Sequence, residues 1–183
     1  MLFRSRDEQW KYTRLRGLEG HEWCRVEGSH SRAELGSDPL NADVRLVFVD
    51  GVLQAQEGAL PEGVEIFSLS KGYQEHGAWL GRVFEAFKDV ATPDAMVALN
   101  RALLRDGTIL RVTGLAAANA LIHLVHVSTT KQGQCLASFP YTLVVVEKGS
   151  QVKICESLIG AGSLGSGLCH RVKDILLEDG AMM

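Results

Sequence analysis

Apolar residues recur along the chain with two different spacings, and the change between them divides the sequence. Over 73–90 they fall three and four residues apart, whereas after residue 106 they form short runs separated by glycine-containing turns. The first spacing places side chains on one face of a helix, and short apolar runs between turn residues are typical of buried strands. The sequence therefore predicts an N-terminal α/β region over 1–106 and a strand-rich region over 107–183.

Strands are predicted on both sides of this boundary. An apolar run at 44–49 is followed by Asp50-Gly51 and a second apolar segment, which is a strong hairpin signal because glycine tolerates a positive φ angle. A short strand is expected over 64–69. Five more are predicted in the second region, at 108–113, 120–127, 141–147, 151–156 and 172–177.

A first helix is predicted over about 73–90. Its apolar stripe includes Trp79, Phe84 and Phe87, which are the expected anchors of this helix on the core.

A second helix is predicted over about 93–105. Thr92 is the expected cap and Pro93 the first helical residue, and Gly107 is expected to end the helix because glycine commonly follows a helix C-terminus. Its buried side is expected to consist of Met96, Leu99, Ala102 and Leu103.

A turn with glycine in its third position recurs around Gly107, Gly149 and Gly180, at unequal intervals. Strands separated by such turns suggest a β-solenoid, and a β-sandwich is the alternative at this level. The last predicted strand is followed only by a turn. Because an uncovered coil exposes unpaired backbone and core, the expectation is an incomplete solenoid.

Composition excludes several classes of protein. Of the 183 residues 46% are hydrophobic and 22% charged, and the net charge is −3. These values argue against a disordered chain and against a nucleic-acid partner, which would need clustered basic residues. No apolar run reaches the roughly 18 residues of a membrane span, and the first residues do not form a secretory signal. A cytoplasmic protein with no membrane partner is the expectation.

Cysteine and histidine residues do not form a metal-binding motif. The four cysteines, Cys24, Cys135, Cys155 and Cys169, are widely and unevenly spaced with no C-x-x-C pair, and reduced thiols are expected. Cys155 could reach Cys135 or Cys169 if the coils stack in register, and Cys155 and Cys169 are the thiols that we consider as metal candidates. His123 and His126 lie three apart in one predicted strand and should point to opposite faces. We assign no metal ligand.

The glycine-rich segment 160–167 contains neither the lysine of a phosphate-binding loop nor a nucleophile elbow between a strand and a helix. We interpret it as a flexible loop. The sequence shows no enzyme active site, and a non-catalytic protein is the expectation.

Four segments, in the right order, resemble the SufB/SufD core family of the SUF iron–sulfur cluster assembly system. They are the E-x-W-K-Y-T-x-L segment at 8–15, the strand and Asp-Gly turn at 44–51, the segment 98–107 followed by Ile109 and Val112, which resembles the family's L-N-x-A-x-x-x-D-G-x-x-I-x-V pattern, and the Phe-Pro strand with its successor at 139–156. The Trp-Lys-Tyr-Thr element is more similar to SufD than to SufB. The resemblance implies a right-handed parallel β-helix whose first coils follow residue 107.

The same resemblance implies a scaffold that acts with a SufB-like protein and a SufC-like ATPase. An iron–sulfur cluster would reside transiently on the full complex, and this segment would bind no cofactor itself. Trp10 and Tyr12 would dock the N-terminal arm on the core. The alternatives are a β-helix enzyme, acyltransferase-like or carbohydrate-acting, and a truncated paralogue with only a binding role.

Overall fold

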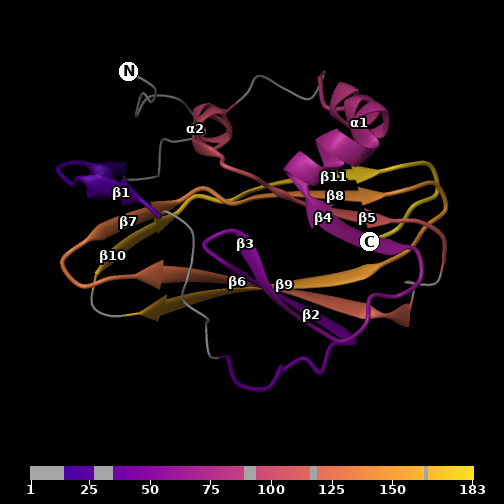
Figure 1. Cartoon of the computed structure of the whole chain (residues 1–183), viewed down its shortest axis with the longest axis horizontal. Helices are drawn as coiled ribbons and strands as arrows, with labels where there is room; N and C mark the ends of the chain where they lie inside the picture. The colour runs from indigo at the N-terminus through magenta and orange to yellow at the C-terminus, as the bar shows by residue number, and fades with distance from the viewer. Residues whose placement is uncertain (1–14, 27–34, 89–93, 116–118, 163–164) are drawn as a thin grey trace.

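The computed structural model describes residues 15–26, 35–88, 94–115, 119–162 and 165–183, with two α-helices and eleven strands among them (Figure 1). The elements are a short 3-10 helix Leu15–Leu18, β1 Trp23–Arg25, β2 Val44–Val49, β3 Val52–Glu57, β4 Val64–Ser68, α1 Leu69–Glu85, α2 Ala95–Leu103, β5 Thr108–Val112, β6 Leu121–Thr130, β7 Cys135–Ser138, β8 Tyr141–Val146, β9 Lys153–Gly162, β10 Ser166–Cys169 and β11 Val172–Leu177. Trp10 and Tyr12 lie outside the described residues.

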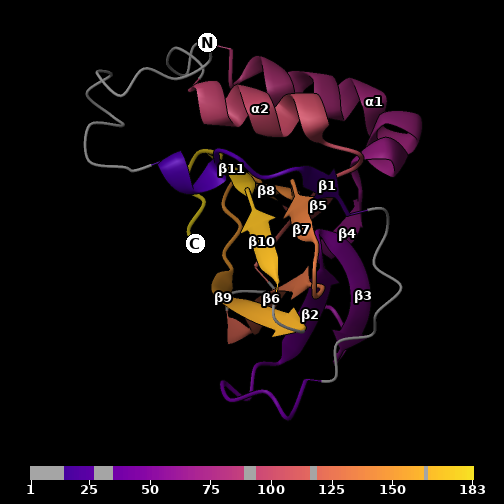
Figure 2. The same cartoon turned by 90° about the vertical axis from the view of Figure 1, so that its left-hand side faces the viewer.

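The strands form three sheets, with the orders β11-β8-β5-β4, β3-β2-β6-β9 and β1-β7-β10. From β6 onward the chain visits them in a repeating order, so that β9, β10 and β11 pair in parallel with β6, β7 and β8. Tyr141 is paired with Val172, and Cys135 is paired with Ser166. The paired residues are separated by the same number of positions along the chain in both sheets. Figure 2 shows β7 and β10 as a side wall between the two larger sheets.

A mainly β chain with a helical part is thus confirmed. Over the described residues, the repeat amounts to two turns, β6-β7-β8 and β9-β10-β11, and does not extend into a longer solenoid. Among the described residues, the antiparallel strand pairs are β2 with β3 and β4 with β5. The predicted strand positions in the second region all coincide with observed strands.

The core lies between the sheets. All six residues of β2 and of β8 are buried, which is typical of strands covered on both faces. The inner cluster joins residues of the two four-stranded sheets and Val152, which precedes β9. Its members are Val44, Leu46, Phe48, Val64, Leu110, Val112, Ile122, Leu124, Val144, Val146 and Val152. Strands from both sides of residue 106 contribute to it, and the boundary between 1–106 and 107–183 stays a prediction.

The predicted hairpin is present. Asp50 and Gly51 have φ angles of 49° and 91°, and two successive positive values suit the tight turn between β2 and β3. The Asp50 carboxylate accepts hydrogen bonds from the backbone N–H of Thr129 at 2.9 Å and from its hydroxyl at 2.6 Å. The turn is therefore tied to β6 as well as to its own strands.

The prediction of a flexible loop at 160–167 is wrong. β9 continues to Gly162 and β10 begins at Ser166. Gly162 has a φ angle of 121°, and a Cβ atom there would lie 2.3 Å from the carbonyl oxygen of Thr130. Glycine is required because the second turn bends directly against the first. The short strands β7 and β10 were not predicted.

The predicted helix boundaries also need correction. α1 begins at Leu69, before the predicted start, because the Ser68 hydroxyl caps it by accepting the Lys71 N–H at 3.1 Å. The cap of α2 is Asp94, which accepts the Met96 N–H at 2.6 Å. The expected cap Thr92 and the expected first helical residue Pro93 lie outside the described residues. A carboxylate is a strong cap because it also favours the positive end of the helix dipole.

Gly107 does not end α2. The helix ends at Leu103, and Leu104 already has extended backbone angles, φ −59° and ψ 132°. A Cβ atom on Gly107 would lie 2.7 Å from Cδ1 of Tyr141. The glycine is needed for the close approach of β5 to the Tyr141 ring.

Candidate functional site

Helices α1 and α2 lie over the outer face of the β11-β8-β5-β4 sheet (Figure 1). Leu80 and Val83 are the fully buried apolar residues of α1 and pack against Ile109, Leu143 and Val145 of the sheet. The expected anchors, Trp79, Phe84 and Phe87, lie at the margin of this cluster and are half-buried. The deepest contact of the helix is therefore made by smaller residues of the same stripe.

The buried residue of α2 is Asn100, which the sequence analysis missed. Its Nδ2 donates to the carbonyl oxygens of Pro140 at 3.0 Å and His170 at 2.6 Å. These two carbonyls precede β8 and β11, so one side chain connects the helix to the same corner of both turns. Leu99 is half-buried, and Ala102 is exposed, contrary to prediction. An asparagine inside an otherwise apolar helix face was the available signal.

Trp79 is held in a polar network at the edge of the sheet. Its indole N–H donates to Oε1 of Glu147 at 3.0 Å, and the guanidinium of Arg111 lies 4.8 Å from the ring centre. Arg111 also donates to Glu147 at 2.7 Å and to Glu65 at 3.2 Å. The network connects α1 to β5 and to the end of β8.

A second polar group lies inside the second turn, around Glu156. Its carboxylate accepts hydrogen bonds from Arg171 and Lys173, both at 2.8 Å, and lies 3.6 Å from Nε2 of His126. His126, Lys173 and Arg171 together hold the pKa of Glu156 well below its ordinary value, against the opposing effect of burial. The His126 ring stacks on Phe48, with centroids 5.0 Å apart.

His123 points to the opposite face of β6, as strand alternation predicts. Its Nδ1 lies 2.8 Å from Oδ1 of Asp38, and its Nε2 lies 2.8 Å from the hydroxyl of Ser157. Burial alone would raise the pKa of Asp38, but backbone hydrogen bonds from Leu40 and Ala42, together with His123, lower it. This chain of bonds fixes the segment before β2 against β6 and β9.

Cys155 and Cys169 do not belong to a group of three or more possible metal ligands among the described residues. Cys155 is paired in register with His123 in the β6-β9 ladder, and Cys169 is paired with Ser138. In the part of the chain that the structure describes, no three His, Cys, Asp or Glu residues form a group that could hold a metal ion. All four thiols are free.

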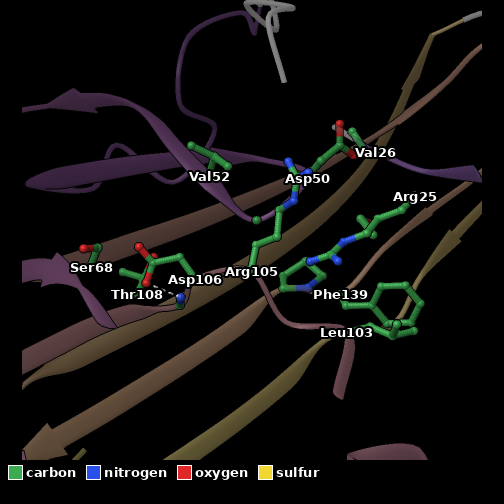
Figure 3. A pocket seen from close by; sticks show the side chains of 14 residues that line it. Arg25, Val26, Asp50, Val52, Ser68, Leu103, Arg105, Asp106, Thr108 and Phe139 are labelled. Carbon is green, nitrogen blue, oxygen red and sulfur yellow. Dashed lines mark hydrogen bonds between the residues drawn. The ribbon is translucent and has the colours of Figure 1, made fainter. Parts of the chain in front are cut away.

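A pocket of about 190 Å³ lies where the hairpin turn, the start of β5 and the corner between β7 and β8 meet. Figure 3 shows Arg25 and Arg105 extending into it from different walls. Apolar side chains of Val26, Val52 and Phe139 form other parts of the wall. The pocket therefore combines two guanidinium groups, the carboxylates of Asp50 and Asp106, and apolar surface.

Comparison with known families finds one similarity, in the central part of the chain. Residues 38–124 match the family model of the SufBD protein N-terminal region. The match begins just before β2, includes both helices and ends within β6. This part of the chain is therefore similar to the N-terminal region of SufBD proteins, and the match includes the hairpin β2-β3 and both helices.

No curated protein matches the chain. Among the described residues, no helix is both long and apolar enough to cross a membrane.

Proposed function

We propose that the chain is a SufD-like, non-catalytic scaffold of iron–sulfur cluster assembly. The observation that carries the proposal is the match of residues 38–124 to the SufBD N-terminal region. This region contains the hairpin β2-β3 and the helical cover, and it leads directly into the repeating turns. The proposed role of this segment is architectural, since the helices cover the outer face of a sheet to which both turns contribute.

The two turns are, in this proposal, the first coils of a right-handed parallel β-helix. Their supporting features are the repeated visit to three sheets and the parallel register, which keeps the same sequence offset in two of them. β9, β10 and β11 each lie at the edge of a sheet within the described residues. Such edges are suited to pair with further strands.

The SufD assignment rests on the E-x-W-K-Y-T-x-L segment at 8–15. Trp10 and Tyr12 are proposed to dock this arm on the core. Trp79, Phe84 and Phe87 are proposed as aromatic anchors of the helical cover, with Leu99 and Gly107 as supporting packing positions.

The proposed partners are a SufB-like scaffold and a SufC-like ATPase, and the iron–sulfur cluster is the cargo of the complex. We assign no cluster ligand to this segment.

Genetic complementation tests the proposal. The chain would be expressed in two bacterial strains, one lacking SufD and one lacking SufB, and growth would be measured under iron limitation. We expect rescue of the SufD-deficient strain only, and co-purification of SufB-like and SufC-like proteins with the tagged chain.

Rescue of the SufB-deficient strain would contradict the SufD assignment. Failure of both rescue and co-purification would contradict the scaffold role. Turnover of an acyl donor or a polysaccharide by the purified chain would favour the β-helix enzyme instead.

A further inference from the structure

We propose that the pocket lined by Arg25 and Arg105 binds a small oxyanion, a phosphate or a carboxylate. This inference is independent of the scaffold role, because it depends on the pocket alone. The pocket is assembled from segments that are distant in the sequence: the end of β1, the hairpin turn and the start of β5.

The two carboxylates that line the pocket already have donors of their own. Asp50 accepts the backbone N–H and the hydroxyl of Thr129. Asp106 accepts the Ser70 N–H at 3.0 Å, the Ser70 hydroxyl at 2.5 Å and the Gly107 N–H at 2.8 Å. Burial acts to raise the pKa of Asp106, but these hydrogen bonds outweigh it and lower the pKa. Both carboxylates are therefore already hydrogen-bonded to donors on the protein.

The guanidinium of Arg25 differs from these carboxylates in its hydrogen bonding. Within the described part of the chain, its guanidinium has no hydrogen-bond or ion-pair partner, although the residue is half-buried. Its backbone is held by the pairing of β1 with β7, which the Val26 N–H extends by donating to Ala137 at 2.9 Å. A guanidinium on a fixed strand presents a planar pair of donors, and that geometry matches two oxygens of a phosphate or a carboxylate.

Arg105 adds a second positive charge on another wall of the pocket, and Figure 3 shows its side chain extending toward Asp50 of the hairpin turn. The apolar walls lower the local dielectric constant, which strengthens an ion–guanidinium contact. At about 190 Å³ the cavity is smaller than typical pockets for drug-sized ligands, which begin near ~300 Å³. The expected ligand is therefore a small anion and not a nucleotide.

Titration of the full chain with inorganic phosphate, and separately with acetate, tests the inference. The readouts are the NMR signals of the arginine Nε–Hε groups at low ionic strength and the resulting dissociation constants. We expect the Arg25 signal to shift with at least one anion, and the stronger of the two titrations identifies phosphate or carboxylate as the preferred group.

Arg25→Gln is expected to weaken binding by about tenfold or more, because a charge-assisted hydrogen-bond pair is lost. Arg25→Lys keeps the charge without the planar fork and should bind with intermediate affinity. Arg82→Gln removes an equal charge from an exposed position on α1 and should change nothing. Amide spectra would verify that each variant is folded. If Arg25→Gln does not fold, Arg105→Gln, at an exposed position, is the second test.

Two results would overturn the inference. One is the absence of a signal shift at Arg25 and Arg105 with either anion at millimolar concentration. The other is an equal loss of affinity in Arg25→Gln and Arg82→Gln, which would indicate a non-specific effect of net charge.

Discussion

The two turns of the chain share one register but differ in burial. All six residues of β8 are buried, whereas only Val172 is buried among the six of β11. β8 has a strand on either side, while β11 has β8 as its single neighbour in the described sheet. The interior positions differ accordingly, since Leu124 of the first turn is paired with Glu156 of the second. Burial in this architecture is thus conferred by stacked neighbours and not by position within a turn.

The largest expected effect comes from shortening one leucine in each turn. Leu124 is 1% exposed and Leu158 is 68% exposed. Leu124→Ala should lower the free energy of unfolding by about 2–5 kcal/mol, because it leaves a cavity in the inner cluster. Leu158→Ala should change it by less than about 0.5 kcal/mol. Urea denaturation measures both, and equal losses would show that the second turn is covered in solution.

A smaller effect is expected from the side chain that connects the two turns. Asn100→Ala leaves two carbonyl oxygens with one donor fewer and should cost about 1–3 kcal/mol. The Val172 N–H, which donates to Pro140 at 3.0 Å beside Asn100, should exchange with solvent faster.

Gln74→Ala, at an exposed amide on α1, is the matched control and should stay within about 0.5 kcal/mol of the parent chain. If Val172 retained its protection in Asn100→Ala, the corner would be held by strand pairing alone.

The smallest effect is a pH dependence that belongs to the second turn. The folded chain lowers the pKa of Glu156 below its ordinary value of 4.5, so the unfolded chain takes up the proton first. The stabilisation is complete above about pH 4.5 and is lost as the pH falls toward the folded-state pKa. Thermal melting at a series of pH values should show that the melting temperature falls less steeply with decreasing pH for Glu156→Gln than for the parent chain.

Glu62→Gln, at an exposed glutamate, should melt with the same pH profile as the parent chain. An unchanged profile in Glu156→Gln would mean that the ion pairs with Arg171 and Lys173 do not persist in solution.

The errors of the sequence analysis have local causes. The strands β7 and β10 were missed because they are short and contain small or polar side chains. The cap of α2 was assigned too early because Thr92, Pro93 and Asp94 are all favourable near a helix start. Gly107 was interpreted as a helix terminator. A glycine in a sequence is equally compatible with a close packing contact, which is the role that the structure shows.

The candidate sites were less predictable than the fold. Asn100, Glu156 and Arg25 acquire their roles from contacts with residues that are distant in the chain, among them the Arg171 that donates to Glu156. Composition and local spacing do not identify the partners in such contacts. The L-N-x-A segment contained Asn100, but its role is visible only with the corner carbonyls in place.

By itself the sequence determined where most strands and both helices lie, because hydrophobic periodicity and turn residues act over a few neighbouring positions. It also contained the segments that relate residues 38–124 to the SufB/SufD family. Only the tertiary structure decided which residues are buried, which carboxylates are already paired and where Arg25 faces a pocket. Those properties depend on the parallel stacking of segments from successive turns, and the energy of that stacking arises from contacts that no local pattern encodes.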